Sequence, residues 1–543
     1  MRSSNPVALE RPCRAPAAPS AVVIGGGVCG LTAAYALLRR AAEAGVALDV
    51  TVVEGEPRFG GKIVTERCGG FVVEGGPDSI LAAKPQAAAL ARELGLGDRL
   101  IGCDGARGRV WVARRGRLAE VPAGLQMLVP TRPGAFLASA LFSWPGKARI
   151  ALERWLPPRP AAGDESLAGF VRRRFGREAL ERLADPVLSS IHLGDPERLS
   201  LAAVWPGCAE LERRHGSLGR GVRAAAAGRT AAGVVPRRAS VTRAAPGTSP
   251  SRFAPGGSAP GGASAGDAAA SEPAFLTLRD GLGGLIEALA GRLGGPGGAA
   301  LLAGRPAAEV RPAAAGGGPP FTVVLADGEA LATDAVLLAV PAYAAAELLA
   351  AARPELAAAL GALPYASAAT VALGFATGAA ALPAGFGFFV PAAERRAVVA
   401  ATFASTKFPG RAPAGCALVR AFVGGARGER WAELPEDELV AAVRADLAKL
   451  LGLTAEPVLA RVHRWPRGYP QYEVGHRERV AALEAQCGPG LYLAGSAYHG
   501  AGIPDTVASA ERAAAAIAEF LAGRAAAGAG RSEPRLARAS TRA

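Results

Sequence analysis

The feature that most constrains this sequence is a glycine-rich turn between an apolar run and a helical pattern near the N-terminus. The run AVVIGG at 21–26 leads into the pattern G-x-G-x-x-G, formed by Gly25, Gly27 and Gly30, and a second apolar run follows at 48–54. Glycines at these positions allow a tight turn and let a pyrophosphate approach the N-terminus of the following helix, whose free N–H groups favour an anion. The order of elements therefore predicts a β-α-β dinucleotide-binding unit.

A second motif follows directly. Glu54 closes the second apolar run, where its carboxylate can accept hydrogen bonds from ribose hydroxyls and disfavours a 2′-phosphate. The segment E-G-E-P-R-F-G-G-K at 54–62 resembles the E-x-x-x-R-x-G-G signature of the flavin amine oxidase superfamily. The resemblance implies FAD rather than NAD, with Arg58 as a clamp on the pyrophosphate and Gly60 and Gly61 beneath the isoalloxazine. A surface turn with an unrelated arginine is the alternative.

A third motif lies near the C-terminus, where the strand-like run LYLAG is followed by a glycine-containing loop and a helix that begins near Asp505. The N-terminus of that helix would direct its positive end toward the flavin pyrimidine edge. Gly30 and Leu491 are 461 residues apart, so both ends of the chain must contribute to one FAD-binding domain. Between them, similar flavoproteins use a backbone contact to adenine, which here falls on Val310.

Four further segments narrow the resemblance to the oxygen-dependent porphyrinogen oxidases. These segments are EGGPDS at 74–79, DPVLSSIHLGDPERLSL at 185–201, RWPRGYPQYEVGH at 464–476 and GIPDT at 502–506. The third is expected to bring Trp465 close to the flavin. Three positions depart from the family pattern: His192 replaces a usual tyrosine, Thr506 a usual cysteine, and Ser496 a usual asparagine or alanine.

The resemblance implies a six-electron oxidation of a porphyrinogen in haem biosynthesis, with three O₂ consumed and three hydrogen peroxide produced. A hydride leaves a meso carbon for flavin N5, and no protein acid or base is essential, so no catalytic side chain is expected. Lys62 is a candidate contact for substrate carboxylates, and a position facing solvent or the flavin is the alternative. The GIPD and GGKI segments favour coproporphyrinogen III over protoporphyrinogen IX. A flavin amine oxidase or carotenoid desaturase, and a non-catalytic FAD-binding protein, remain alternatives.

The expected cofactor is non-covalent FAD, because the 495–500 loop contains no cysteine. No metal site is expected. The residues expected to bind the cofactor are Gly25, Gly26, Gly27, Val28, Cys29, Gly30, Glu54, Arg58, Gly60, Gly61, Lys62, Gly76, Pro77, Asp78, Ser79, Val310, Trp465, Gly495, Ser496, Ala501, Gly502 and Ile503.

Net charge does not indicate nucleic-acid binding, although it is +14. Residues 1–20, 226–272 and 523–543 contribute +2, +3 and +4, which leaves +5 for the rest of the chain. No basic run interleaved with aromatic residues is found there.

Seven scattered cysteines without a C-x-x-C pair favour a reducing compartment. The N-terminus lacks a signal-peptide pattern, no membrane-spanning run occurs, and a cytoplasmic protein is expected.

One apolar segment of the sequence is relevant to membrane association. Residues 121–156 are rich in Leu, Ala, Phe and Trp but are interrupted by charges and prolines. They are compatible with short helices that lie on one face of a bilayer, on the inner side of the membrane. Ordinary buried helices are the alternative.

The expected fold is a mixed α/β architecture with a Rossmann-like FAD domain, a mixed or antiparallel sheet for the substrate, and a helical subdomain. Gly-, Pro- and Ser-rich composition predicts a disordered insertion between strand-like runs. The expected division is a disordered N-terminus (1–19), the FAD-binding domain (20–80, 273–345 and 485–523), the substrate-binding domain (81–118 and 346–484), the helical subdomain (119–225), the insertion (226–272) and a disordered basic tail (524–543).

Overall fold

A computed structural model gives the fold of the chain. It describes residues 18–103, 108–159, 163–231, 273–313, 318–379 and 382–529. Most of the three segments expected to be disordered lies outside these residues. Helix α10 (Leu218–Ala231) continues into the segment that begins at 226, and α18 (Ile503–Ala529) continues beyond 524. Both extensions are alanine-rich, and alanine has the highest helix propensity.

A five-stranded parallel sheet forms the centre of the first domain, with the strand order β12-β2-β1-β16-β22. The outer strand β22 comes from the far end of the chain, so the prediction of a domain built from both ends is confirmed. The strands are β1 (Ser20–Ile24), β2 (Asp49–Val53), β12 (Ala300–Leu302), β16 (Ala335–Leu338) and β22 (Leu491–Leu493).

Helices cover both faces of this sheet, as apolar strands in a parallel sheet require. In β1, Ala21 and Val23 pack into one core, and Val22 and Ile24 pack into the other. The first core contains α1 (Val28–Ala44), α2 (Gln86–Glu93), α11 (Gly283–Leu293) and α18. The second contains α12 (Ala342–Leu349), α13 (Pro354–Gly361), α17 (His476–Cys487) and the small sheet β13 (Ala307–Pro312), β14 (Phe321–Leu325) and β15 (Ala330–Thr333).

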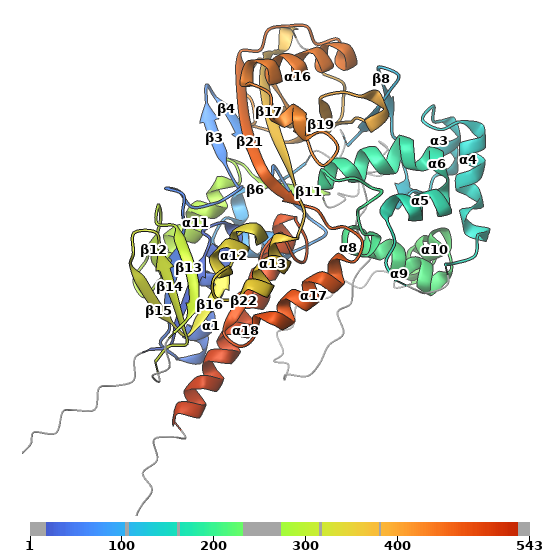
Figure 1. Cartoon of the computed structure of the whole chain (residues 1–543). Helices are drawn as coiled ribbons and strands as arrows, with labels where there is room; N and C mark the ends of the chain where they lie inside the picture. Colours follow the sequence, from blue (N-terminus) through green and yellow to red (C-terminus); the bar gives the residue numbers. More distant parts are fainter. Residues whose placement is uncertain are drawn as a thin grey trace, which may run out of the picture.

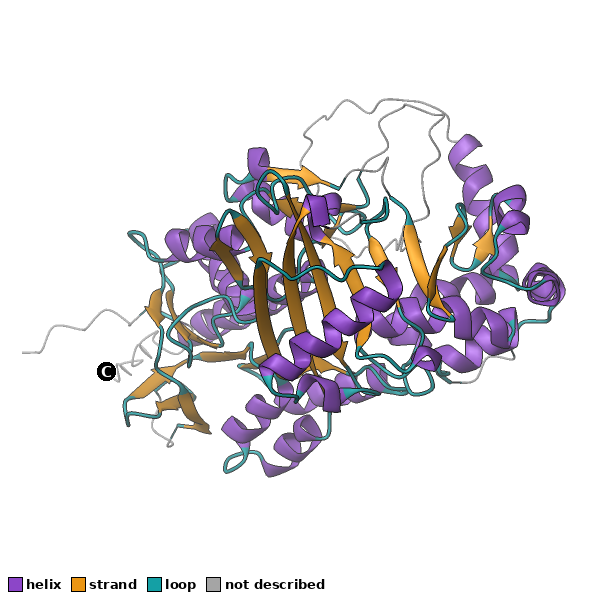
Figure 2. Cartoon of the chain, turned by 90° about the horizontal axis from the view of Figure 1, so that it is seen from above, coloured by secondary structure: helices purple, strands orange, loops and turns teal. Residues whose placement is uncertain are grey.

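A seven-stranded, mostly antiparallel sheet lies beyond the first domain, with the order β21-β17-β20-β19-β18-β7-β8 (Figures 1 and 2). Its outer face packs against α16 (Glu436–Leu451) in an apolar core. The strands are β7 (Val110–Arg114), β8 (Arg117–Glu120), β17 (Tyr365–Ala376), β18 (Gly387–Phe389), β19 (Val398–Phe403), β20 (Cys416–Gly424) and β21 (Leu459–Pro470).

Short sheets connect the two domains. The hairpin β3 (Thr65–Cys68) and β4 (Phe71–Glu74) leads from the second glycine pair toward the larger sheet. The other small sheet contains β5 (Ile80–Leu81), β6 (Leu100–Gly102) and β11 (Phe275–Leu278).

The helical subdomain, on the right of Figure 1, has its own apolar core. The segment Leu180–Ser189 forms a π-helix that contains Pro186. Proline has no N–H to donate to the hydrogen bonds of a regular α-helix. The other elements are β9 (Leu125–Gln126), β10 (Val129–Pro130), α3 (Pro133–Ala138), α4 (Trp144–Ala151), a 3₁₀ turn η3 (Leu152–Trp155), α5 (Leu167–Phe175), α7 (Ser190–His192), α8 (Leu201–Val204), α9 (Pro206–His215) and α10. Among the described residues, no helix is both long and apolar enough to cross a bilayer.

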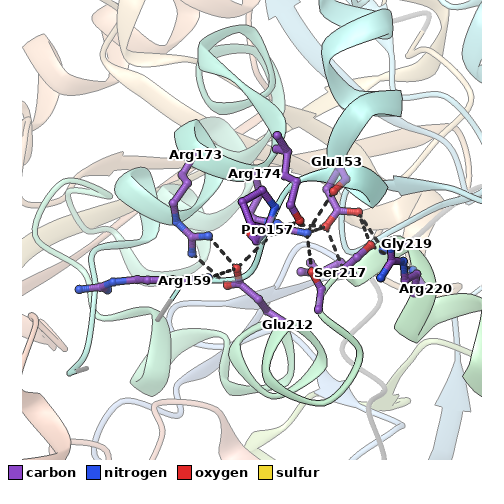
Figure 3. Close-up of polar contacts among 12 residues, drawn as sticks. Glu153, Pro157, Arg159, Arg173, Arg174, Glu212, Ser217, Gly219 and Arg220 are labelled. Carbon is purple, nitrogen blue, oxygen red and sulfur yellow. Dashed lines mark hydrogen bonds and ion pairs between the residues drawn. The ribbon is translucent and has the colours of Figure 1, made fainter. Parts of the chain in front are cut away.

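A buried ion network fixes these helices to one another (Figure 3). Arg174 is fully buried, and its Nε lies 3.0 Å from Glu153 Oε1. Glu153 also accepts hydrogen bonds from Ser217 Oγ at 2.9 Å and from the Gly219 N–H at 3.0 Å. Glu212 lies on the other side of the guanidinium, with 3.4 Å between Oε1 and Nη1. Because buried charges are costly unless paired, loss of one member of this network would leave an uncompensated charge between η3, α5 and α10.

Candidate active site

The first glycine loop leaves no room for side chains at two of its positions. Gly25 has φ +108°, and a Cβ there would lie 2.8 Å from the Ala339 carbonyl oxygen. A Cβ on Gly30 would lie 1.8 Å from the Gly25 oxygen. Gly27 caps α1 without any side-chain hydrogen bond and forms a parallel β-bridge with Gly60. The structure thus brings the two predicted glycine motifs together at an uncovered helix N-terminus, which fits a pyrophosphate.

Glu54 lies at the carboxyl end of β2, beside this loop. Its Oε2 accepts a hydrogen bond from the Gly26 N–H at 2.7 Å, and its Oε1 accepts one from the Glu56 N–H at 2.9 Å. Arg58 donates through Nη2 to the Gly61 carbonyl at 2.7 Å and therefore folds over its own loop. The ribose role of Glu54 and the pyrophosphate role of Arg58 both stay predictions.

Three side chains from the larger sheet hold the next loop, at 75–79. Thr370 Oγ1 donates to the Gly75 carbonyl at 2.8 Å, and Trp465 Nε1 donates to the same oxygen at 3.0 Å. Arg420, which is 2% exposed, donates through Nη2 to the Gly76 carbonyl. The sequence pointed to Trp465 but not to Thr370 or Arg420. The only signal for Arg420 was a charged residue within an apolar strand.

Asp78, in the same loop, faces two cations. Lys407 Nζ lies 3.3 Å from Asp78 Oδ1 and 3.0 Å from Ser79 Oγ, and Arg420 Nη1 lies 3.9 Å from Asp78 Oδ2. Burial disfavours the carboxylate, but Lys407 and Arg420 outweigh burial and hold the pKa of Asp78 well below its usual range. The loop therefore carries a paired ionic centre, to which Lys407 was not expected to contribute.

Lys62 points across the boundary between the two domains. Its ammonium donates to the Gly468 carbonyl, and burial lowers its pKa to about 8. A cleft of about 240 Å³ opens here, lined in part by Arg58, Lys62, Tyr343 and Trp465. Lys62 thus lies in a cleft rather than on an open surface, and its contact with substrate stays a prediction.

The C-terminal loop at 495–500 lies between β22 and α18. Gly495 has φ +129°, and its N–H donates to Ser509 Oγ at 3.2 Å. Tyr472 donates to the Ser496 carbonyl, and His476 Nε2 lies 3.0 Å from the Tyr498 carbonyl oxygen. Both residues belong to the PQYEVGH segment quoted from the sequence, but neither was expected to contact this loop.

Lys84 and His192 lie near the C-terminal loop, and His192 belongs to the helical subdomain. Lys84 Nζ lies 2.7 Å from Asp505 Oδ1, near the beginning of α18. His192 ends α7, with its ring centroid 6.3 Å from that of Tyr472. Burial, together with Lys84, lowers the pKa of His192 to about 4. The departure at His192 thus places a neutral imidazole beside the motif residue Tyr472.

The remaining predicted residues occupy the starts of helices or the core. Val310 is buried in β13, where it pairs with Val323, and its contact to adenine stays a prediction. Val28 and Cys29 begin α1, Pro77 lies in the 75–79 loop, Ala501 and Gly502 precede α18, and Ile503 begins it.

Comparison with known proteins agrees with this geometry. The family model for flavin-containing amine oxidoreductases matches residues 28–518. Coproporphyrinogen III oxidase of Propionibacterium freudenreichii is 38% identical over 497 residues, which are 91% of this chain and 89% of the relative. Chloroplastic protoporphyrinogen oxidase of Oryza sativa is 30% identical, over 93% of this chain and 90% of the relative. A crystal structure from Exiguobacterium sp. 255-15 superposes with a TM-score of 0.74 at 29% identity, covering 92% of this chain and 99% of that one.

Proposed function

The chain belongs to the flavin-containing amine oxidoreductase family, and from this premise we propose that it is an FAD-dependent oxidase of coproporphyrinogen III in haem biosynthesis. The observation that carries the proposal is the convergence of four loops, at 25–30, 60–63, 75–79 and 495–500, around one boundary between the domains. Bound flavin supplies the hydride acceptor and the group that dioxygen reoxidises, with release of hydrogen peroxide.

Non-covalent FAD is the cofactor that these loops suit best. Gly27 and Gly60 lack side chains and pair backbone to backbone beside the N-terminus of α1, and Glu54 supplies a carboxylate for ribose hydroxyls. The 495–500 loop reads GSAYHG, so it offers no thiol for a covalent bond to the flavin. Heat-denatured protein should release FAD, and protein that stays colourless after incubation with FAD would contradict the assignment.

The side chains of this site orient the flavin and the substrate and stabilise their charges. They do not exchange protons with the substrate. The N-terminus of α18 places positive partial charge beside the 495–500 loop, which favours negative charge on a reduced flavin. Asp78 is held ionised by Lys407 and Arg420 and so does not titrate during turnover near neutral pH. Lys62 provides an ammonium group at the cleft, where a substrate carboxylate can pair with it.

Coproporphyrinogen III is favoured over protoporphyrinogen IX by the names of similar proteins. The relative from Propionibacterium at 38% identity is a coproporphyrinogen III oxidase, as is one from Bacillus subtilis at 33%. The deciding experiment mixes the oxidised protein anaerobically with each porphyrinogen and follows loss of flavin colour. Faster bleaching with protoporphyrinogen IX would reverse the substrate assignment, and bleaching only by amines or polyenes would replace the reaction.

We further propose that the protein acts in the cytoplasm and contacts the inner face of a membrane through the helical subdomain. The six cysteines among the described residues are free thiols, as a reducing compartment favours. An apolar stripe with spacing i, i+4, i+7, i+8, i+11 faces outward along α4 and η3. It consists of Trp144 (69% exposed), Ala148, Ala151, Leu152 (50%) and Trp155 (58%).

Anionic lipid is the partner that fits this stripe. Residues 132–159 carry five Arg or Lys side chains, of which Lys147 is buried, against one carboxylate, Glu153, which is buried in the ion network. The Arg154 guanidinium lies 3.8 Å from the centre of the Trp155 ring, so charge and aromatic surface occur together. Tryptophan and basic residues are typical of helices that lie in the interface of a bilayer.

Vesicle sedimentation tests this contact. Protein should sediment with vesicles rich in anionic lipid and much less with neutral vesicles. The double variant Trp144→Ser, Trp155→Ser should lose this binding while keeping its FAD, whereas Val458→Ser, at a valine 62% exposed outside the subdomain, should not. Equal sedimentation of all three proteins would contradict the membrane contact.

A further inference from the structure

One short segment of the chain contacts three of the four cofactor loops. Segment 465–476 runs from the last part of β21 to the first residue of α17. Near its beginning, Trp465 donates to the Gly75 carbonyl at 3.0 Å, and the Gly468 carbonyl accepts a hydrogen bond from Lys62. These contacts reach the loops at 75–79 and 60–63.

The end of the segment reaches the third loop, at 495–500. Tyr472 (3% exposed) and His476 (2% exposed) stack with ring centroids 4.3 Å apart. Tyr472 donates to the Ser496 carbonyl, and His476 Nε2 lies 3.0 Å from the Tyr498 carbonyl. Burial lowers the pKa of His476 to about 4, so the ring is neutral, and its Nε2 must carry the proton because a carbonyl only accepts.

These two bonds fix the direction of the loop amides. In a trans peptide the C=O and the following N–H point in opposite directions. Since the Ser496 and Tyr498 carbonyls point toward Tyr472 and His476, the N–H groups of the next residues point away from them. The buried pair thus determines which side of the loop presents donors.

The segment is itself held from its other side. The Ser200 N–H donates to the Tyr472 carbonyl at 2.7 Å, and the Gly475 N–H donates to Asp164 Oδ2 at 3.1 Å. Both partners belong to the helical subdomain. Segment 465–476 therefore lies between that subdomain and the cofactor loops, with bonds to both.

We propose that Tyr472 and His476 are positioning residues for the flavin. They hold the 495–500 loop so that its amides face the cofactor in one fixed orientation, and segment 465–476 keeps that loop in register with those at 60–63 and 75–79. This inference rests on the proposed function. Fixed donors aimed at developing negative charge accelerate a reaction because they need no reorganisation when the charge forms.

The test compares Tyr472→Phe with a matched control in the full-length protein. Tyr492→Phe also removes one hydroxyl that donates to a backbone carbonyl, that of Ala516 at 3.3 Å, away from the loops. Tyr472→Phe should weaken FAD binding about threefold to tenfold, the range expected for one such bond. It should also lower kcat with little change in KM and make the flavin harder to reduce, while Tyr492→Phe leaves all three unchanged.

Variants at His476 provide a second test, in which a conservative substitution should restore part of the lost FAD affinity. His476→Leu should behave like Tyr472→Phe, and His476→Gln, which retains an N–H donor, should recover part of the loss. If Tyr472→Phe and Tyr492→Phe lower only the melting temperature, with equal FAD affinity and flavin potential, the positioning role is wrong. Wild-type protein that holds no FAD, or that oxidises no porphyrinogen, would instead contradict the proposed function.

Discussion

Lys407 and Asp78 lie 329 residues apart in the sequence, yet the Lys407 ammonium is 3.3 Å from the Asp78 carboxylate. The lysine ends the short helix α14 (Ala404–Lys407), which follows β19, and the aspartate lies in the 75–79 loop, outside the larger sheet. The pair is therefore an ionic link between the two domains, and its loss should affect both stability and cofactor binding.

Lys407→Met should lower the free energy of unfolding at pH 7 by about 1.5–3 kcal/mol, because it removes one charged partner of Asp78 and leaves the carboxylate with Arg420 and the Ser79 hydroxyl. The pKa of Asp78 is depressed in the folded state, so its contribution is present above the unfolded pKa, near about 3.9, and is lost as the pH falls through the lower folded pKa. Urea unfolding should thus show a gap between wild type and variant that narrows below about pH 4. Lys449→Met, at an exposed lysine, is the control, and a gap independent of pH would contradict the link.

Glu54→Gln should weaken FAD binding by about 1.5–3 kcal/mol, because it removes the charge from an acceptor of hydrogen bonds at the ribose position. Titration of the apoprotein with FAD, followed by quenching of flavin fluorescence, measures the change. Glu43→Gln, on the exposed end of α1, should have no effect. Equal affinities of all three proteins would exclude Glu54 from the cofactor site.

Gly30→Ala should abolish FAD binding or folding, since its Cβ would meet the Gly25 carbonyl oxygen at 1.8 Å, and backbone cannot move aside cheaply. Gly291→Ala lies in α11, where a Cβ meets nothing within 4 Å, and should raise stability by about 0.5–1 kcal/mol. Flavin absorbance of the purified proteins and their thermal unfolding distinguish the two effects. A yellow, stable Gly30→Ala protein would contradict the close packing described for the first loop.

Lys62→Met should raise KM for coproporphyrinogen III by about tenfold, the equivalent of one charge-assisted hydrogen bond, and should affect protoporphyrinogen IX less. The pKa of Lys62 is lowered to about 8, so its ammonium predominates only below that pH. KM of the wild type should therefore rise as the pH passes 8, whereas that of Lys62→Met should not. Steady-state rates from product fluorescence at constant ionic strength give both values, and parallel pH profiles would show that Lys62 does not contact substrate.

The sequence predicted the strand, turn and helix around the first glycine motif, whereas the role of that turn in binding FAD stays a prediction. Gly25, Gly27 and Gly30 stand next to the strand and helix that they connect, so a short pattern suffices to find them. Contacts of Thr370, Arg420 and Lys407 depend on how distant strands align, which no local pattern records. Arg420 stands as a charged residue within the apolar run CALVRAFV, and that pattern alone does not say which group it contacts.

The order of strands in the central sheet has a consequence for synthesis of the protein. On the ribosome, β1 emerges 311 residues before its neighbour β16, which at about 5–20 residues per second takes roughly 15–60 s. During that time the backbone edge of β1 that pairs with β16 has no partner strand, and the edge strand β22 follows later still. The nascent chain therefore cannot complete this five-stranded sheet before Leu491–Leu493 has been synthesised.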